Sequence, residues 1–434
     1  MRFWLSLVAA AALAPALPAD NWPAFRGPNE DGTSAAANVP TRWGEAENVA
    51  WKTAIHGKGW SSPVVWGDQI WVTTADEVRG GKAAPTPKTG SAKGAVEKVT
   101  FFAVCVDRAT GKVTHDVPLA AEDNPAFSHD FNSYASPTPA VEAGRVYAHF
   151  GSHGTWCVDT ATGKVLWERR DLKCDHFRGP GSSPIIYKNL LVLIFDGADQ
   201  QYVAALDKAT GRTVWKKDRN IKYATDNGDA KKAYATARVV NIGGKPHLVA
   251  PSAEVTIAYD PATGDELWRF QHTKKGSMNV GARPVAANGL LYLVSGHPAQ
   301  LMAVKETGAT GAVSKDAVAW ETDKAVPSRP SLLVSGDLLF MVSDGGVVSC
   351  LDAKTGKPHW SERLGGQYTA SPVLAGGHIY LPNEIGKTTV LKASKDYEVV
   401  AVNTLDAGCM ASPAVTGDTL LLRTKTHLYA IGKK

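Results

Sequence analysis

The sequence predicts an all-β protein, an eight-bladed β-propeller of four-stranded antiparallel blades whose last blade is closed by an N-terminal strand. Three observations predict this fold class. One short string recurs along the chain, turn residues separate short apolar runs at a regular spacing, and the C-terminal unit is one strand short. Units of roughly 40–50 residues that each supply four strands are typical of propeller blades.

The recurring string is CVDTATGKVLW at 157–167, and related copies begin at residues 105, 205, 258 and 350. In each copy an apolar run ends in Asp, two residues and a Thr-Gly pair follow, and Trp usually closes the string. The Asp carboxylate can accept backbone N–H bonds that fix a turn, and Gly supplies a positive φ. The string therefore predicts a strand, a tight turn and a second strand.

A second marker, a Ser-Pro or Arg-Pro pair, precedes another apolar strand in seven of the units. Proline suits the first residue of a strand, because its missing N–H breaks no ladder there. The pairs are Ser62-Pro63, Ser136-Pro137, Ser183-Pro184, Arg283-Pro284, Arg329-Pro330, Ser371-Pro372 and Ser412-Pro413. A turn and a strongly apolar strand such as LLVLIF come next, so each unit contains four strands.

The two ends of the chain predict how the ring closes. The last unit, 411–434, supplies only three strands, while ENVAWKTAI at 47–55 is a strand without a unit. Pairing the two would complete the eighth blade and remove the open sheet edges that otherwise promote aggregation.

The tryptophans of the string are expected on the outer strands, docked between neighbouring blades, where each would bury on the order of 200 Å². They are Trp51, Trp167, Trp215, Trp268, Trp320 and Trp360. Stacking on a substrate is the alternative role. The first blade has His115 at this position and the seventh has no aromatic residue, so we expect looser seams there.

The N-terminus predicts export. Residues 1–19 combine a basic residue, an apolar stretch and small residues before Asp20, which is the pattern of a signal peptide. A membrane helix is the alternative, but Pro15 and Pro18 interrupt a segment already short for spanning. We expect a monomeric propeller in the periplasm or outside the cell, with no transmembrane segment.

The mature chain divides into a lead-in segment at 20–47 and the propeller at 48–434. Residues 77–98, rich in Lys, Pro and Gly, are expected to form a disordered insertion in the first blade. The formal net charge is +5, and this insertion alone carries five basic and two acidic residues. The remainder is nearly neutral, which argues against a nucleic-acid-binding face.

The cysteines do not indicate a disulfide framework. Cys105, Cys157 and Cys350 occupy the first position of the string, where other copies have Ala, so small buried side chains are expected. The sequence leaves the state of Cys174 and Cys409 open.

The string resembles the tryptophan-docking motif of the quinoprotein (PQQ-type) β-propellers over about 48–434. NWPAFRGPNEDG at 21–32 is also similar to the lead-in of exported PQQ-like repeat proteins. That family includes PQQ-dependent alcohol and glucose dehydrogenases and scaffolds of the BamB type. The dehydrogenases carry a vicinal Cys-Cys disulfide and a calcium site of Glu, Asn and Asp. This sequence has no Cys-Cys pair and shows no such calcium site, so PQQ with Ca²⁺ is only an alternative cofactor.

Candidate binding residues lie in the loops after strands two and four of each unit, which share one face and vary between units. The expected ligand funnel is lined by His129, Asp130, Asn132, His176, Arg178, Asn279, Arg283, Arg329 and Gln367. The loops after strand two add His153, Asp196, His297, Asp344 and Glu384. Arginine presents a forked donor matched to carboxylates, and PQQ is a tricarboxylate, so an anionic ligand is expected.

Simpler roles remain open for several of these residues. Arg283 and Arg329 replace Ser before Pro and could bond carbonyl groups of the next blade. His129-Asp130 and Asp175-His176 could ligate a metal, but adjacent residues on a strand point to opposite sides, so no metal site is predicted.

We therefore expect a binding or assembly scaffold that holds a protein partner or a small anionic ligand on its variable-loop face. The alternative is a PQQ-dependent oxidoreductase of the alcohol or sugar dehydrogenase type, with the cofactor in the central funnel. A hydrolase or lyase on a propeller frame is the third interpretation. The sequence assigns no catalytic residues.

Overall fold

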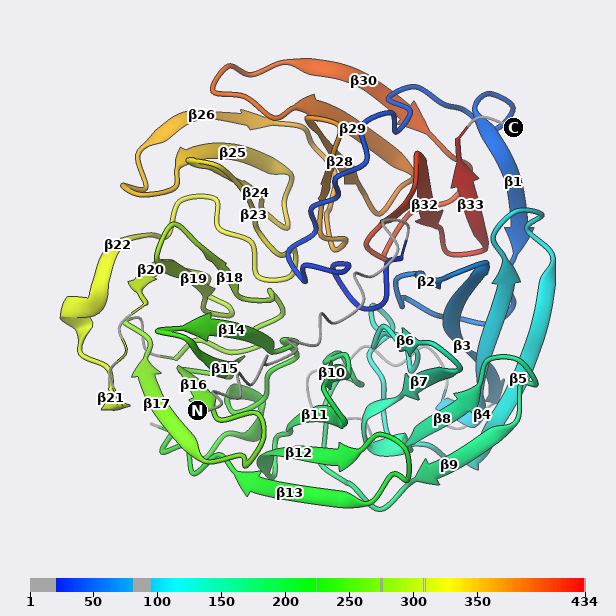
Figure 1. The fold of residues 1–434 in the computed structure, drawn as a ribbon, viewed down its shortest axis with the longest axis horizontal. Helices are drawn as coiled ribbons and strands as arrows, with labels where there is room; N and C mark the ends of the chain where they lie inside the picture. Colours follow the sequence, from blue (N-terminus) through cyan, green and yellow to red (C-terminus); the bar gives the residue numbers. More distant parts are fainter. Residues whose placement is uncertain are drawn as a thin grey trace, which may run out of the picture.

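The computed structural model describes residues 21–80, 95–223, 225–273, 276–306, 308 and 310–432. The predicted signal peptide at 1–19 and the central part of the predicted insertion lie outside this range. Eight antiparallel sheets surround a central axis, with chain order running around the ring (Figure 1). The predicted fold class is confirmed.

In the first seven blades the strands follow chain order from the axis outward. The first three blades are β2 (Val64–Trp66), β3 (Gln69–Gly80), β4 (Ala95–Asp107), β5 (Val113–Asp123); β6 (Ala140–Glu142), β7 (Arg145–His149), β8 (Thr155–Asp159), β9 (Val165–Arg169); and β10 (Ile185–Tyr187), β11 (Leu190–Asp196), β12 (Gln201–Asp207), β13 (Thr213–Asp218). The fourth and fifth are β14 (Arg238–Ile242), β15 (Lys245–Pro251), β16 (Val255–Tyr259), β17 (Glu266–Gln271); and β18 (Val285–Ala287), β19 (Leu290–Val294), β20 (Leu301–Lys305), β22 (Val318–Thr322). The sixth and seventh are β23 (Leu333–Ser335), β24 (Leu338–Val342), β25 (Val347–Asp352), β26 (Pro358–Arg363); and β27 (Val373–Ala375), β28 (His378–Pro382), β29 (Lys387–Lys392), β30 (Val399–Thr404).

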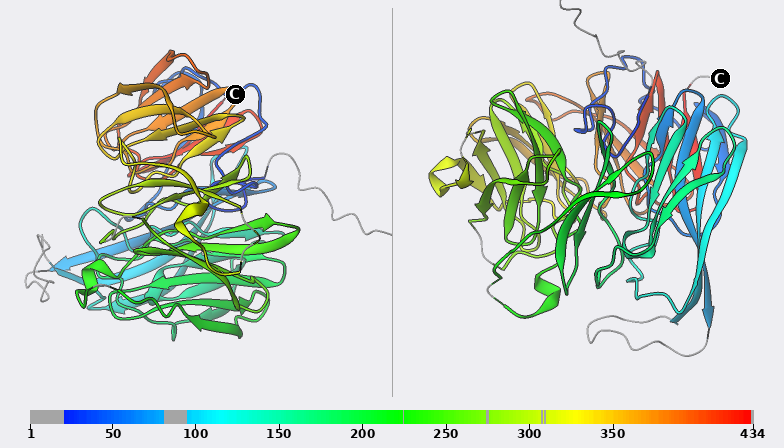
Figure 2. Two further views of the ribbon diagram at one scale, coloured as in Figure 1. Left: turned by 90° about the vertical axis from the view of Figure 1, so that its left-hand side faces the viewer. Right: turned by 60° about the horizontal axis from the view of Figure 1, so that its bottom comes forward.

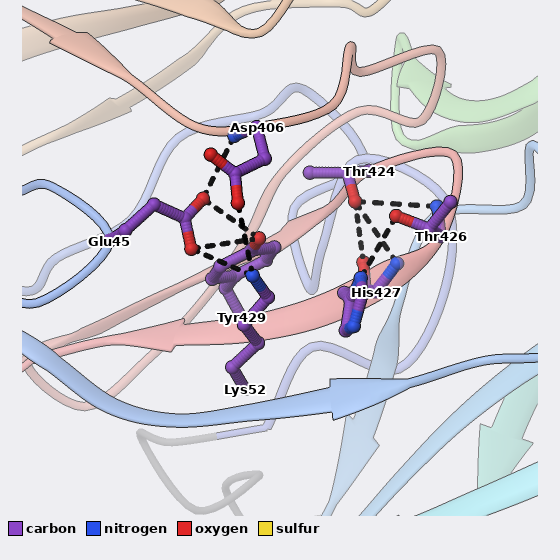
Figure 3. A network of polar contacts seen from close by, with 7 residues as sticks. All are labelled: Glu45, Lys52, Asp406, Thr424, Thr426, His427 and Tyr429. Carbon is purple, nitrogen blue, oxygen red and sulfur yellow. Dashed lines mark hydrogen bonds and ion pairs between the residues drawn. The ribbon is translucent and has the colours of Figure 1, made fainter.

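The eighth blade joins the two ends of the chain. Its inner strands are β31 (Ala414–Thr416), β32 (Thr419–Arg423) and β33 (His427–Ile431), and β1 (Val49–Ala54) is its outer strand. Strand β1 pairs antiparallel with β33, as predicted, and Trp51 lies opposite Ala430. A polar network reinforces the junction (Figure 3): Glu45 accepts hydrogen bonds from Lys52 Nζ at 2.8 Å and from the Tyr429 hydroxyl at 3.0 Å.

Helix is confined to short 3₁₀ turns at Gly151–His153, Gly228–Ala230 and Lys315–Ala317 in the described part of the chain. No helix there is both long and apolar enough to cross a bilayer. A two-residue strand, β21 (Gly311–Ala312), adds in parallel to the outer edge of β17.

The recurring string makes its contacts across the seam between blades. In the third blade Asp207 Oδ1 accepts the backbone N–H of Thr210 at 2.9 Å and its hydroxyl at 2.7 Å, which closes the turn. Gly211 follows at φ +73°, and a Cβ there would lie 2.8 Å from the indole of Trp167 in the second blade. The string therefore contains both halves of one contact, the tryptophan and the turn that receives the tryptophan of the preceding blade.

Five of the six predicted tryptophans donate Nε1–H to a backbone carbonyl of the next blade. The acceptors are Arg108 for Trp51, Lys208 for Trp167, Pro261 for Trp215, Ala353 for Trp320 and Ser394 for Trp360, at 2.9–3.3 Å. Trp268 differs, because its Nε1 donates to Nδ1 of His247 in its own blade at 2.9 Å. The indole is nevertheless buried, with only 3% of its surface exposed.

The seam after the seventh blade is filled by a residue from the lead-in. Ala401 occupies the register position where other blades have Trp. Trp43 packs there instead, with its ring centroid 6.2 Å from that of Tyr380. The same spacing, 6.1–6.2 Å, separates Tyr292 from Trp320 and Phe340 from Trp360. The expectation of a loose seam is therefore wrong at this position, because an aromatic side chain arrives from a distant part of the sequence.

Both ends of the predicted disordered insertion are ordered. Strands β3 and β4 remain paired as far as Gly80 and Ala95, so residues 77–80 and 95–98 are ordered strand. Residues 81–94 lie outside the described range. This hairpin projects beyond the ring on one face (Figure 2).

The lead-in crosses the centre of the ring on the face that carries the short turns (Figure 1). Trp22 exchanges backbone hydrogen bonds with Val65, Val141 N–H donates to Pro23, and Ser34 N–H donates to Leu374. These bonds tie the segment to the inner strands of the first, second and seventh blades. The lead-in therefore covers one end of the central channel.

The glycine of the turn should matter more for its contact with the indole than for its backbone angle. Gly289 has nearly the same φ, +71°, but nothing lies within 4 Å of the place that a Cβ would take there. We expect Gly211→Ala to lower the free energy of unfolding by about 2–4 kcal/mol, and Gly289→Ala by about 1 kcal/mol. Urea titration of both variants measures the difference, and equal losses would contradict the contact.

Trp43 should contribute as much stability as a tryptophan within the string. We expect Trp43→Ala to lower the free energy of unfolding by about 3–5 kcal/mol, because it empties a buried seam. Trp360→Ala in the preceding seam is the matched control. A loss below about 1 kcal/mol for Trp43→Ala alone would show that the seventh seam is loose.

Candidate ligand-binding funnel

A cavity of about 480 Å³ lies on the axis, on the face opposite the lead-in's crossing. The loops that precede the first strand of each blade form its wall, and Phe25 of the lead-in contributes at its closed end. The cavity is therefore a funnel open on the variable-loop face.

Each blade contributes one residue from an equivalent position to the funnel wall, four residues before its innermost strand begins. These eight residues differ in size and chemistry: Trp60, Ser136, Gly181, Tyr234, Gly281, Arg329, Thr369 and Met410. A rigid frame thus presents a variable ring, which is a common arrangement for binding sites.

Below the variable ring, hydroxyl groups link the blades. The backbone N–H of Ser62 donates to Thr138 Oγ1 at 3.0 Å, and Thr138 N–H donates to Ser183 Oγ at 3.0 Å. The same bond, at 2.9–3.0 Å, recurs from Ser183 to Thr236, from Arg283 to Ser331, from Ser331 to Ser371 and from Ser371 to Ser412. In several blades the Ser of the Ser-Pro marker is thus a link to the neighbouring blade, a role that the sequence alone did not indicate.

This register separates the two arginines that precede proline in the sequence. Arg283 occupies the hydroxyl position in the fifth blade, whereas Arg329 lies two residues earlier than that position, which Ser331 fills in the sixth blade. Arg283 is 2% exposed and donates to the carbonyls of Ala237 at 3.0 Å and Phe25 at 2.5 Å. Arg283 is not among the residues that line the funnel. It bonds to carbonyls, as in its alternative role, but these belong to the preceding blade and the lead-in instead of the next blade.

Arg329 lies in the funnel wall but already has two carboxylate partners. Its Nε donates to Asp344 Oδ1 at 3.2 Å and its Nη1 lies 3.5 Å from Glu384 Oε1. Its guanidinium carbon is 4.5 Å from the ring centroid of Phe131, within the range of a cation–π contact. Arg329 therefore shapes the wall, and its charge is locally balanced.

Arg178 is less completely paired. Its Nη2 lies 3.6 Å from Asp229 Oδ2, and its Nε has no hydrogen-bond partner among the described residues. Asp229 also pairs with Lys232, whose side chain is fully buried. Burial lowers the pKa of Lys232, although the bond to Asp229 opposes this shift. Two cations thus share one carboxylate on this side of the funnel.

Three further predicted residues lie beside Arg178 in the wall. Asn132 Nδ2 donates to the carbonyls of Arg178 at 2.9 Å and Pro180 at 3.0 Å, so it fixes the loop. Asn279 adopts φ +61°, and its Oδ1 lacks a partner in the described structure. Burial, followed by the charge of Arg178, lowers the pKa of His129. His297 and Asp344 also line the funnel.

The remaining predicted residues lie outside the cavity. Asp130 is paired with Arg79 at 3.6 Å, Gln367 is exposed, and His176 accepts the Ser152 N–H at 3.0 Å. The others are held by partners of their own: Asp175 by Phe177 N–H, His153 by Glu122, Asp196 by Arg219, and Glu384 by Thr369 and Arg329. The structure thus gathers His129, Asn132, Arg178, Asn279 and Arg329 and excludes Asp130, His176, Arg283 and Gln367.

The match to known proteins agrees with this architecture. A family model described as outer membrane protein assembly factor BamB matches residues 95–227, 251–311 and 311–433, which is more than half of the chain. The chain belongs to this family of PQQ-like β-propellers.

Two curated relatives match part of the chain. A tetrathionate hydrolase of Acidithiobacillus ferrooxidans is 26% identical over 256 residues, which is 57% of this chain and 49% of the relative. The BamB protein of Legionella pneumophila is 21% identical over 248 residues, with the same coverage. The matched region spans about half the length of each relative.

Solved structures of other PQQ-like propellers share the fold. BamB from Moraxella catarrhalis superposes with a TM-score of 0.54 at 13% identity, covering 87% of this chain and 98% of its own. The quinohemoprotein alcohol dehydrogenase of Comamonas testosteroni has a TM-score of 0.63 at 12% identity, covering 96% and 81%. These likenesses establish the fold alone.

The residues of this PQQ-like propeller do not fit a calcium-bound quinone. Asp344 is the one carboxylate in the described funnel wall, and three N–H donors from Ser328 and Arg329 already occupy it. All five cysteines are free and buried, so no disulfide covers the cavity. Nowhere in the described ranges do three His, Cys, Asp or Glu side chains converge as metal ligands.

Buried histidines make this propeller sensitive to acid. Burial lowers the pKa of His149, His176 and His272 to about 3. Below about pH 6.5 the unfolded chain binds protons that the folded state does not, so stability falls as pH falls from about 6.5 towards 3. Each histidine contributes a slope of up to about 1.4 kcal/mol per pH unit.

We expect His272→Gln to reduce the dependence of the unfolding free energy on pH by up to about 1.4 kcal/mol per pH unit, because glutamine does not bind a proton in this range. Urea titrations at pH values of about 7, 5.5 and 4.5 measure the slope. His359→Gln, at an exposed position, is the control. An unchanged slope in the His272 variant would contradict the assignment.

Proposed function

We propose that this chain is an exported binding propeller that receives an anionic group of its ligand in the funnel on the variable-loop face. The observation that carries the proposal is the blind cavity of about 480 Å³, to which every blade contributes one variable residue. A cavity of this size suits a small molecule or one anionic side chain of a larger partner.

The distribution of charge favours an anion on the side of Arg178. Arg178 and Lys232 share the single carboxylate of Asp229, and Arg178 Nε is an unused donor in the described structure. Although Nε itself is buried, 30% of the Arg178 side chain is exposed, and a guanidinium binds carboxylates and other oxyanions well. Arg329 contributes less, since Asp344 and Glu384 already balance its charge.

The apolar part of the wall favours a ligand with a planar or hydrophobic portion. Trp60, Phe131, Tyr234 and Met410 line the same cavity. Trp60 is fixed because its Nε1 donates to the Phe131 carbonyl at 3.1 Å. Aromatic side chains held in this way offer contact area without a further loss of conformational freedom.

The relatives support this proposal in general terms. One is named as an outer membrane protein assembly factor, and another is named for hydrolysis of tetrathionate, which is a dianion. Export rests on the apolar N-terminal segment of residues 1–19.

The proposal is tested with three probes: tetrathionate, PQQ with and without Ca²⁺, and a short peptide rich in Asp and Glu. Binding is measured by isothermal titration calorimetry and by intrinsic tryptophan fluorescence. We expect Arg178→Gln to lower the affinity for whichever probe binds by roughly 10–100-fold, because a charge-assisted hydrogen bond is lost. Arg329→Gln should weaken it less than about threefold, since its charge is already balanced.

Arg212→Gln, at an exposed position of the opposite face, is the matched control and should bind like the wild type. A small-molecule ligand predicts binding of tetrathionate or PQQ, whereas a protein partner predicts binding of the acidic peptide alone. Binding of none, or an Arg178→Gln variant with wild-type affinity, contradicts the proposal. Dye-linked oxidation of an alcohol or sugar in the presence of PQQ and Ca²⁺ would instead support the alternative, a PQQ-dependent oxidoreductase.

A further inference from the structure

Three arginines gather at the plugged end of the channel. Arg26 belongs to the lead-in, whereas Arg238 and Arg283 belong to the fourth and fifth blades. The pKa of Arg26 is lowered to about 9, chiefly by burial; Asp31 opposes this shift, and the charges of Arg283 and Arg238 add to it. Two carboxylates of the lead-in face the cluster: Glu30 lies 3.0 Å from Arg283 Nη2, and Asp31 lies 3.8 Å from Arg238 Nη2.

Arg26 is the cation of this cluster without an ion-pair partner. Only 2% of its surface is exposed, and no carboxylate of the described chain lies within 4 Å of its guanidinium. Its Nη atoms donate to backbone carbonyls, those of Pro372 at 2.5 Å, Asp31 at 2.5 Å and Leu332 at 2.6 Å. Carbonyls satisfy the N–H groups but leave the positive charge uncompensated, which is costly in a buried site.

Two donors of the cluster remain unused. Arg26 Nε and Arg238 Nη1 are buried and have no hydrogen-bond partner in the described structure. A buried N–H without an acceptor costs about 1–3 kcal/mol, so such groups normally meet an ion or a water molecule. Gly32 covers the face of the Arg26 guanidinium so closely that a Cβ at Gly32 would clash with it. Because the Nη atoms already bond to carbonyls, Nε is the donor of Arg26 that a ligand would meet.

We propose that a small inorganic anion of the chloride type binds at the edge of Arg26, between its Nε–H and the free Nη1–H of Arg238. Its single negative charge balances the third guanidinium, which a water molecule cannot do. Its small size suits a buried position between the lead-in and two blades. The site is separate from the funnel and does not depend on the proposed ligand.

One other carboxylate could compete for this role. Glu306 lies within electrostatic range of Arg238, but no ion pair joins the two within 4 Å. Burial raises the pKa of Glu306, which disfavours its charged form. Three guanidinium groups therefore face two carboxylates, and one positive charge stays unpaired.

The anion would stabilise the docked position of the lead-in at the closed end of the channel. Arg26 bonds to residues of the sixth and seventh blades through Leu332 and Pro372, and Arg283 holds the carbonyl of Phe25 at the closed end of the funnel. The desolvation cost of Arg26 arises only when the lead-in is docked against the blades. An anion that neutralises this charge therefore stabilises the docked lead-in relative to the undocked one. Occupancy of the site should therefore raise the stability of the whole ring.

The test measures thermal unfolding of the full chain as chloride replaces gluconate at constant ionic strength. From about 2 to 200 mM chloride we expect the melting temperature to rise by about 2–4 °C, because a ligand of the folded state alone stabilises by mass action. Arg238→Gln should abolish the rise. Arg363→Gln removes the same charge from an exposed position and should keep it.

A melting temperature that does not respond to chloride in the wild type, or responds equally in both variants, overturns the proposal. Crystals soaked in bromide give an independent readout if Arg238→Gln fails to fold. An anomalous peak within about 3.5 Å of Arg26 Nε supports the site, and a map without one at full bromide exchange overturns it.

Discussion

The ring depends on one contact, an aromatic side chain of one blade against the glycine turn of the next, which the described structure makes at five of the eight seams. Trp167 over Gly211 shows the arrangement: the turn must have a positive φ and no Cβ, and the indole fills the space that results. A ring of eight blades has no free end to absorb a poor seam. Where the string lacks its tryptophan, other side chains take the position, His115 over Gly163 and Trp43 beside Tyr380.

Most of the fold could be predicted from the sequence because the residues that make this contact recur in each repeat. Asp, Thr, Gly and Trp recur at fixed spacing, so the strands, the turns and the eighth blade completed by Trp51 all follow from the sequence itself. The place of Trp43 could not be predicted in the same way. It reaches Tyr380 from near the other end of the chain, and no repeat marks a contact of such long sequence separation.

The candidate site was only partly predictable, for a reason of register. Both Arg283 and Arg329 precede proline, but they occupy loop positions that are two residues apart. Arg329 lines the cavity, whereas Arg283 is buried against carbonyls of the fourth blade and of the lead-in. The signal that could have separated them is the Ser or Thr aligned across blades, with Ser331 rather than Arg329 as the equivalent of Ser62. The position of the lead-in could not be predicted for another reason. It contains no repeat, and its place is set by contacts with blades that are distant in the sequence.

The same constraint explains why the fold alone says little about function in this family. The docking turns fix one face and the lead-in covers that end of the axis, so chemical variety is confined to the opposite face. There, each blade contributes from an equivalent position one wall residue that takes no part in the tryptophan-docking contacts, and replacing Gly181 or Tyr234 would alter the cavity without altering those contacts. A PQQ-like propeller can therefore keep its frame at 12–13% identity while its funnel is rebuilt. Resemblance to BamB or to a quinohemoprotein dehydrogenase establishes the frame, and the residues that line the funnel, Arg178 and the variable ring among them, decide what enters it.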